Sequence, residues 1–205
     1  MKKLKYLGLM LMAAFILSCG SSTTILSSFK APEVTTLHYK KVFVSSLTEK
    51  PSVKQTVENS VSQALNARGI ATVKSIDAFP PGLHTSSKDS ILQIIRSNGC
   101  DGILTIALIK KEKETSYVPG SGGYYGTFGA YYGYGYNSFY SPGYYTEDKI
   151  YYVQTNVYDT KTEKLEWAAE SKTTNPSSLE SFLQDYQKAV ADRAVKDGVV
   201  QPAAK

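Results

Sequence analysis

The sequence predicts an α/β domain, with a mixed sheet of about five strands, helices packed on the sheet and the order β-α-β-α-β-β-β-α. Three patterns indicate this class. In the first half, apolar residues at helical spacing alternate with short strand-like runs. Residues 102–109 are almost wholly apolar, which is typical of a strand buried on both faces. Two alternating segments, 150–158 and 164–172, flank a turn and predict a hairpin.

The first strand is expected at 41–47, and the first helix opens with Pro51. Ser52 and Gln55 have the spacing of a capping box. The buried face of this helix is predicted from residues recurring at helical spacing, namely Val53, Val57, Val61, Ala64 and Leu65. Gly69 is expected to end the helix.

A second strand is expected at 70–76, followed by a loop at 80–82. Ser86 or Ser87 is then in position to cap a second helix, which ends at Asn98-Gly99. Its buried side is predicted to hold Ile91, Leu92, Ile94 and Ile95. Strand 102–109 is placed in the centre of the sheet. Because helices separate the first three strands, right-handed crossovers and parallel pairing are expected between them.

The late hairpin turns at 159–163. Trp167, on its second strand, is interpreted as a core anchor. Ser177 and Glu180 are spaced as a capping box for a last helix, which Gly198 closes. The apolar stripe of this helix is expected to contain Leu179, Phe182, Leu183, Tyr186, Ala189, Val190 and Ala194.

The first twenty residues predict the location of the protein. Three lysines precede an apolar run at 6–17, and a small-residue site ends in Cys19, which resembles the lipobox of bacterial lipoproteins. Twelve apolar residues span only ~18 Å as a helix, whereas a bilayer core needs ~30 Å. We therefore expect a cleaved signal peptide and a lipid-modified (palmitate-type) Cys19, rather than a membrane-spanning helix.

The predicted organisation has a signal peptide at 1–18, a lipidated tether at 19–36, a single domain at 37–200 with an insertion at 117–146, and a disordered tail at 201–205. Residues 25–29 of the tether could instead pair as an edge strand. No aspartate follows Cys19, which favours the outer membrane over inner-membrane retention. The domain is expected to face the periplasm, with surface exposure left open.

Composition narrows the function classes. Three lysines are removed with the signal peptide, so the formal charge falls from +5 to +2. The sequence shows no basic patch of the kind that would predict nucleic-acid binding. With Cys19 used for lipid, Cys100 has no disulfide partner and is interpreted as a small buried thiol. His38 and His84 lack metal-type spacing, and no cofactor or metal is expected. Glu166 and Glu170 are expected to project together from a solvated strand face. The chain is therefore not expected to be an enzyme.

The insertion is anomalous in composition. Its thirty residues carry no charge, eight glycines and ten of the sixteen tyrosines of the chain. Three interpretations stay open: a flexible low-complexity loop with stacked rings, a binding surface in which tyrosines give contact area at low entropic cost, or contact with the bilayer interface. The candidate binding residues are Tyr124, Tyr125, Tyr131, Tyr132, Tyr134, Tyr136, Tyr140, Tyr144 and Tyr145.

Four stretches carry a resemblance to known proteins: 39–44, 99–104, 117–120 and the hairpin 158–167 with its Tyr-Asp…Lys-Leu-x-Trp pattern. They resemble a group of uncharacterised Gram-negative lipoproteins of unknown function. The element order is more loosely similar to periplasmic assembly lipoproteins, including penicillin-binding-protein activators, the curli secretion lipoprotein and the amino-terminal domain of the Tol translocation protein. Such domains act by binding other envelope proteins.

These observations predict a membrane-anchored periplasmic lipoprotein that serves as a non-catalytic binding or assembly module of the cell envelope. Its partners would be the membrane, through the lipid anchor, and another envelope protein or a glycan. The alternative is a carbohydrate- or peptidoglycan-binding module that uses the same tyrosines.

Overall fold

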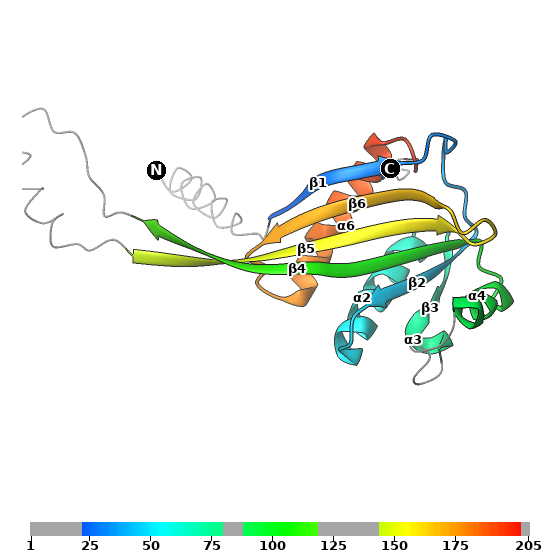
Figure 1. Cartoon of the computed structure of the whole chain (residues 1–205), viewed down its shortest axis with the longest axis horizontal. Coiled ribbons are helices and arrows are strands. Elements are labelled where there is room, and N and C mark those ends of the chain that lie inside the picture. The colour runs from blue at the N-terminus through cyan, green and yellow to red at the C-terminus, as the bar shows by residue number, and fades with distance from the viewer. Residues whose placement is uncertain (1–21, 80–87, 119–143, 202–205) are drawn as a thin grey trace, which may run out of the picture.

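The computed structural model describes residues 22–79, 88–118 and 144–201. It confirms the α/β class, with a six-stranded mixed sheet and helices packed against it (Figure 1). The elements in chain order are β1 (Ser22–Lys30), β2 (Lys41–Leu47), α2 (Pro51–Asn66), β3 (Ala71–Lys74), α3 (Ser75–Ala78), α4 (Lys88–Ser97), β4 (Gly102–Val118), β5 (Tyr144–Asp159), β6 (Leu165–Thr174) and α6 (Leu179–Lys196).

The strands lie in the order β1-β6-β5-β4-β2-β3. β2 pairs in parallel with β3 and β4, whereas β4–β5, β5–β6 and β6–β1 are antiparallel. This arrangement confirms the predicted parallel pairing of the early strands, the interior place of β4 and the late hairpin.

β1 includes residues 25–29, for which the sequence allowed either a flexible tether or an edge strand. It pairs along β6 from Ser22 opposite Thr174 to Lys30 opposite Trp167. Just after it, Ala31 and Val34 are buried. The flexible tether expected at 19–36 is therefore not seen across 22–36, because β6 offers this segment a free edge and an apolar cluster to pack against.

The helices cover different parts of the two faces of the sheet. Val42 and Val44 of β2 pack in the core that α2 and α6 help to form, around Val57, Val61, Leu183 and Tyr186. Phe43 points the other way, as alternation along a strand requires, and packs with Ile95 of α4 and Cys100. In Figure 1, the opposite face of β4, β5, β6 and β1 has no described helix over it.

A third cluster confirms the role expected of Trp167. This side chain is only 2% exposed and packs with buried residues of the post-β1 loop, β6, α6 and the chain after it, namely Ala31, Val34, Ala169, Ala194 and Val199. Its indole nitrogen donates to the Asp197 carboxylate at 2.9 Å. The tryptophan thus joins β6 to the end of α6.

Two predicted helix caps are wrong in detail. α2 begins at Pro51 after Lys50, with no side-chain cap, because proline at the first position already places Ser52 inside the helix. α6 begins one residue later than expected, and its capping box is formed by Ser178 and Ser181 instead of Ser177 and Glu180. Ser86 and Ser87, the expected caps of α4, lie outside the described residues.

β4 and β5 extend well beyond the predicted strands 102–109 and 150–158. They stay paired as far as Val118 opposite Tyr144. β2 leaves β4 at Ala107, and β6 leaves β5 at Ile150. Residues 113–118 and 144–149 therefore form a two-stranded ribbon, here called the arm, which projects past the rest of the sheet (Figure 1).

Candidate functional site

Most of the predicted site residues lie outside the described residues. These are Cys19, Tyr124, Tyr125, Tyr131, Tyr132, Tyr134, Tyr136 and Tyr140. Tyr144 and Tyr145 lie in β5 at the far end of the arm, where their backbones pair with Val118 and Tyr117. The side chain of Tyr145 is 73% exposed. The structure therefore places the start and end of the insertion at the end of the arm.

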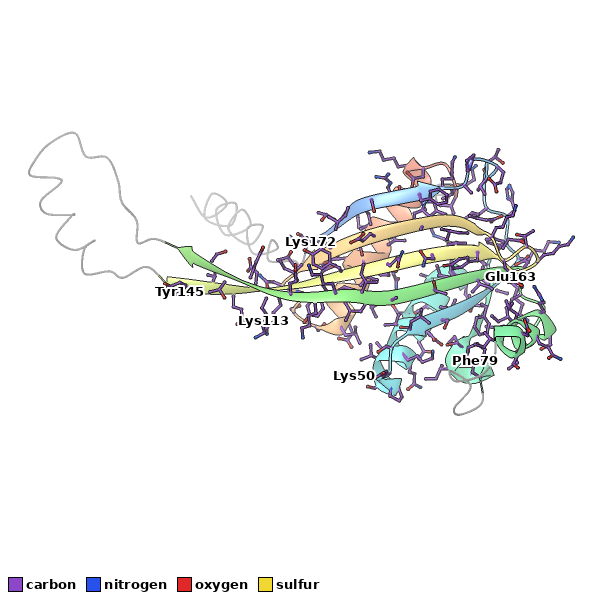
Figure 2. The ribbon with its side chains drawn as sticks, in the orientation of Figure 1. Lys50, Phe79, Lys113, Tyr145, Glu163 and Lys172 are labelled. Atoms are coloured by element: carbon purple, nitrogen blue, oxygen red, sulfur yellow. The ribbon has the colours of Figure 1, made fainter. Side chains whose placement is uncertain are left out.

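The arm is charged near the sheet and uncharged towards its end. Lys113 pairs with Glu147 across the two strands at 2.8 Å, and this contact lowers the pKa of the Glu147 carboxyl. From Thr115 to Thr146 the sequence carries no charge. Figure 2 labels Lys113 and Tyr145 along this ribbon. Both edges of the arm lack a neighbouring strand among the described residues, and charged side chains such as Lys113 and Glu147 disfavour edge-to-edge pairing near the sheet.

One row of paired residues relates the arm to the N-terminal end of the described chain. Ser22 lies opposite Thr174, Thr174 opposite Ile150, and Ile150 opposite Glu112. Since β1 and β5 run in the same direction, β1 starts at the end of the sheet from which the arm projects. The sequence could not show this proximity, because the pairing of β1 with β6 joins Ser22 to Thr174, far apart in the chain.

An apolar groove opens between the N-terminal ends of α2 and α6, on the sheet face that these helices cover. Its volume is about 680 Å³. The groove is lined by Ser46, Leu47, Thr48, Glu49, Lys50, Val53, Val57, Ile106, Leu108, Lys111, Tyr151, Val153, Pro176, Ser177, Ser178, Leu179, Phe182 and Leu183. Sequence reasoning missed it, since each apolar member reads as an ordinary strand or helix residue. We call it the α2–α6 groove.

A second cavity of about 610 Å³ lies farther along the same helices, beside the loop that carries His38. Its apolar lining includes Val61, Trp167 and Val190, with Arg68 and Gln187 among the polar members. His38 thus lines a largely apolar cavity. Among the described residues, no three His, Cys, Asp or Glu side chains are grouped to hold a metal ion.

The buried carboxylate of Glu58 was also missed by sequence reasoning. Its side chain is fully buried and accepts hydrogen bonds from the Ser46 and Ile76 backbone amides, at 2.9 Å each, and from the Ser75 hydroxyl at 2.6 Å. Lys54 lies 3.3 Å away. These contacts join α2 to β2 and to the start of α3, so Glu58 is a structural residue.

The expected pairing of Glu166 with Glu170 on a solvated face is wrong. Glu166 lies at an irregularity between Leu165 and Trp167, where the register of β6 against β5 shifts. The Tyr39 hydroxyl donates to its carboxylate. Burial, and then this hydrogen bond, raise the pKa of the Tyr39 phenol. Glu166 is half-buried and engaged with Tyr39, rather than free on a solvated face.

Cys100 is a buried free thiol, as predicted. Burial raises its pKa, and the nearby Asp101 raises it further, while the positive charge of Lys41 acts in the opposite direction. A raised pKa keeps the thiol protonated and weakens it as a nucleophile. The contacts with Phe43 and Ile95 give it a packing role instead.

Within the described ranges, no helix is both long and apolar enough to cross a membrane. No protein-family model matches the chain, and no curated protein matches it. The resemblance to uncharacterised Gram-negative lipoproteins therefore stays an expectation from the sequence.

Solved structures give remote matches. The PelC dodecamer from Paraburkholderia phytofirmans is 18% identical, with 78% of this chain and 89% of that chain covered and a TM-score of 0.43. Lipoprotein GNA1162 from Neisseria meningitidis is 12% identical, with 76% and 98% covered and a TM-score of 0.40. A PDZ domain protein from Parabacteroides distasonis is 11% identical, with 95% and 40% covered and a TM-score of 0.35. At these values we transfer neither residues nor partners.

Proposed function

We propose that the chain is a lipid-anchored, non-catalytic binding module of the bacterial cell envelope, which binds another envelope component through the insertion carried by the arm. The observation that carries this proposal is the common end of the sheet shared by the start of β1 and the arm. Only Gly20 and Ser21 lie between Cys19 and Ser22, so the three steps along the chain span at most ~10 Å. A lipid on Cys19 would thus hold this end of the domain close to its membrane.

The arm gives the insertion its reach. From Glu112 to Val118 the ribbon extends ~20 Å beyond the last row of the sheet, at ~3.4 Å per residue. The partner is therefore met near the membrane surface rather than far from it. Tyrosines suit such contacts because each offers a large, rigid ring together with a hydroxyl for hydrogen bonding.

A non-catalytic role is supported by the structural hydrogen bonds that three carboxylates accept. Glu58 accepts from backbone and hydroxyl donors, and Asp101 accepts from the backbone amides of Lys40 and Lys41 at 2.9 Å each. Asp197 accepts from Trp167. Each of these carboxylates holds separate elements together, which accounts for its position without a reaction.

The binding role is tested by replacing residues 120–143 with a short turn and cross-linking in intact cells, followed by mass spectrometry. We expect the partners recovered with the parent protein to be lost, while thermal unfolding stays unchanged because every residue of the described sheet is retained. Recovery of the same partners from the shortened chain would refute it. Glycan-array binding that disappears when the insertion tyrosines become alanine would instead support the carbohydrate-binding alternative.

The anchor is tested separately. Labelled palmitate should enter the parent protein but not Cys19→Ala, and only the parent should fractionate with the outer membrane. If the Cys19→Ala protein fractionates like the parent, the proposed lipid anchor is wrong, and so is the proposed location facing the periplasm.

A further inference from the structure

The α2–α6 groove opens at the same end of the domain as the start of β1. Leu47 is the last residue of β2, Lys50 precedes α2, and Ser178 precedes α6. Pro176, which also lines the groove, lies two residues after Thr174, the partner of Ser22. The groove is therefore placed near the proposed anchor at Cys19.

Two large aliphatic side chains in the lining of the groove are left open to solvent. Leu47 is 59% exposed and Leu108 is 53% exposed, although both contribute to an otherwise apolar wall with Val53, Leu179 and Phe182. Exposed apolar surface that is continuous with an apolar hollow is typical of a binding site. The volume also falls within the range of roughly 300–1,000 Å³ that is usual for pockets taking small molecules.

The polar part of the lining favours an anion. Lys50 and Lys111 lie in it, against a single acidic residue, Glu49. The Lys111 ammonium lies 5.3 Å from the centre of the Tyr151 ring, which holds it beside the apolar wall. The N-terminal end of α2 also lies here, with no side-chain cap and no acidic residue in its first turn, whereas that of α6 is capped by Ser178 and carries Glu180. Helix N-termini add a favourable potential for negative charge. Figure 2 labels Lys50 at the start of α2.

We infer that the α2–α6 groove takes an acyl chain of an anionic phospholipid from the membrane, with the lipid phosphate against Lys50 and Lys111. The inference rests on the proposed anchor, because Cys19 is what would bring this end of the chain to a bilayer. An apolar tail matches the leucine, valine and phenylalanine lining, and the lysines match the charge of the headgroup. The groove would thus add a second, non-covalent contact with lipid.

The experiment uses two adjacent residues of similar exposure. Leu108 lines the groove, whereas Ile109, 49% exposed, does not. Each is replaced in turn by the photo-cross-linking residue benzoylphenylalanine in the full-length, lipidated chain. The purified proteins are reconstituted in vesicles of phosphatidylcholine, alone or in equimolar mixture with phosphatidylglycerol, and lipid adducts are measured by mass spectrometry.

The inference expects a phosphatidylglycerol adduct at residue 108, a several-fold lower yield at residue 109, and loss of the preference for phosphatidylglycerol in Lys50→Ala/Lys111→Ala. Equal yields at the two positions would show only general nearness to the bilayer and would overturn the inference. No lipid adduct at residue 108 would overturn it as well, as would an adduct formed with phosphatidylcholine and phosphatidylglycerol alike.

Palmitate incorporation, measured on the same preparations, separates the two proposals. If palmitate is present and residue 108 forms no lipid adduct, the groove inference fails while the anchor stands. If palmitate is absent, the anchor fails. Val53→Phe provides a second test, since a larger ring in the groove wall should reduce the adduct at residue 108 without changing palmitate incorporation. An undiminished adduct would place the lipid outside the groove.

Discussion

Glu58 shows how much a single buried side chain contributes to this fold. Its carboxylate is the shared acceptor for donors from β2 and from the start of α3. Glu58→Ala would leave the Ser46 and Ile76 amides and the Ser75 hydroxyl without this acceptor. We expect the free energy of unfolding to fall by about 3 kcal/mol, measured by urea denaturation.

The matched control is Glu33→Ala, because Glu33 is exposed. This change should alter the free energy of unfolding by less than about 0.5 kcal/mol. Similar losses in the two variants would mean that the Glu58 contacts do not stabilise the junction of α2, β2 and α3.

The raised pKa of the buried Tyr186 phenol predicts a loss of stability at alkaline pH. Burial raises the pKa of its phenol from 10.0 to about 12, against the opposing effect of the hydrogen bond with Thr155. The unfolded chain therefore releases this proton first. The stabilisation is fully present below about pH 10 and is lost as the pH rises towards about 12. Tyr39, whose pKa is also raised, acts in the same direction.

Denaturation of the parent and of Tyr186→Phe across this pH range isolates the contribution. The variant should be about 1 kcal/mol less stable at neutral pH, since it lacks the 2.5 Å hydrogen bond with Thr155. Its deficit should shrink above pH 10, where the parent loses up to about 1.4 kcal/mol per pH unit from this group. A constant difference at all pH values would contradict the raised pKa.

At the scale of elements, two neighbouring serines at the start of α6 have different roles. Ser178 accepts from the Ser181 amide at 3.1 Å and is the cap, whereas the Ser177 hydroxyl lies 3.0 Å from the Ser181 hydroxyl. Ser178→Ala should cost about 1 kcal/mol, and Ser177→Ala clearly less. Thermal unfolding of the two variants checks this, and the reverse order would restore the capping box that the sequence predicts.

At the scale of the whole molecule, β1 decides where the domain begins. It supplies the neighbour of β6, and Ile25 packs against the cluster around Trp167. A chain that starts at residue 31 should therefore be several kcal/mol less stable than one that starts at residue 20, and it should aggregate through the exposed edge of β6. Calorimetry and light scattering test this. Equal stability would mean that residues 22–30 contribute nothing to the folded domain.

Local patterns predicted the individual elements with different success. β2 has the predicted bounds, because the β-branched and aromatic residues at 42–44 lie within a short segment between polar loops. β3 ends earlier than the predicted 70–76, since Glu58 draws Ser75 and Ile76 into the first turn of α3. β4 and β5 are longer than predicted, because alternating lysines and glutamates carry no apolar signal although they pair across the arm.

The candidate site was predictable only in part. The insertion is visible in the sequence from its tyrosines and its lack of charge. The α2–α6 groove is not visible, because Leu47, Leu108 and Phe182 belong to three separate elements that only packing brings together. Glu166 was assigned to the wrong surroundings for a similar reason, since the register shift in β6 arises from pairing with β5.

The sequence by itself determined the class of the fold and the order of most elements, because the spacing of apolar residues is a local property that each strand or helix carries on its own. Only the tertiary structure decided that Ser22, Thr174, Ile150 and Glu112 share one row, so that the start of β1, the arm and the groove lie at one end of the domain. The physical reason is that the pairing of β1 with β6 and the packing of α2 with α6 join residues more than a hundred positions apart, and no local pattern fixes those contacts.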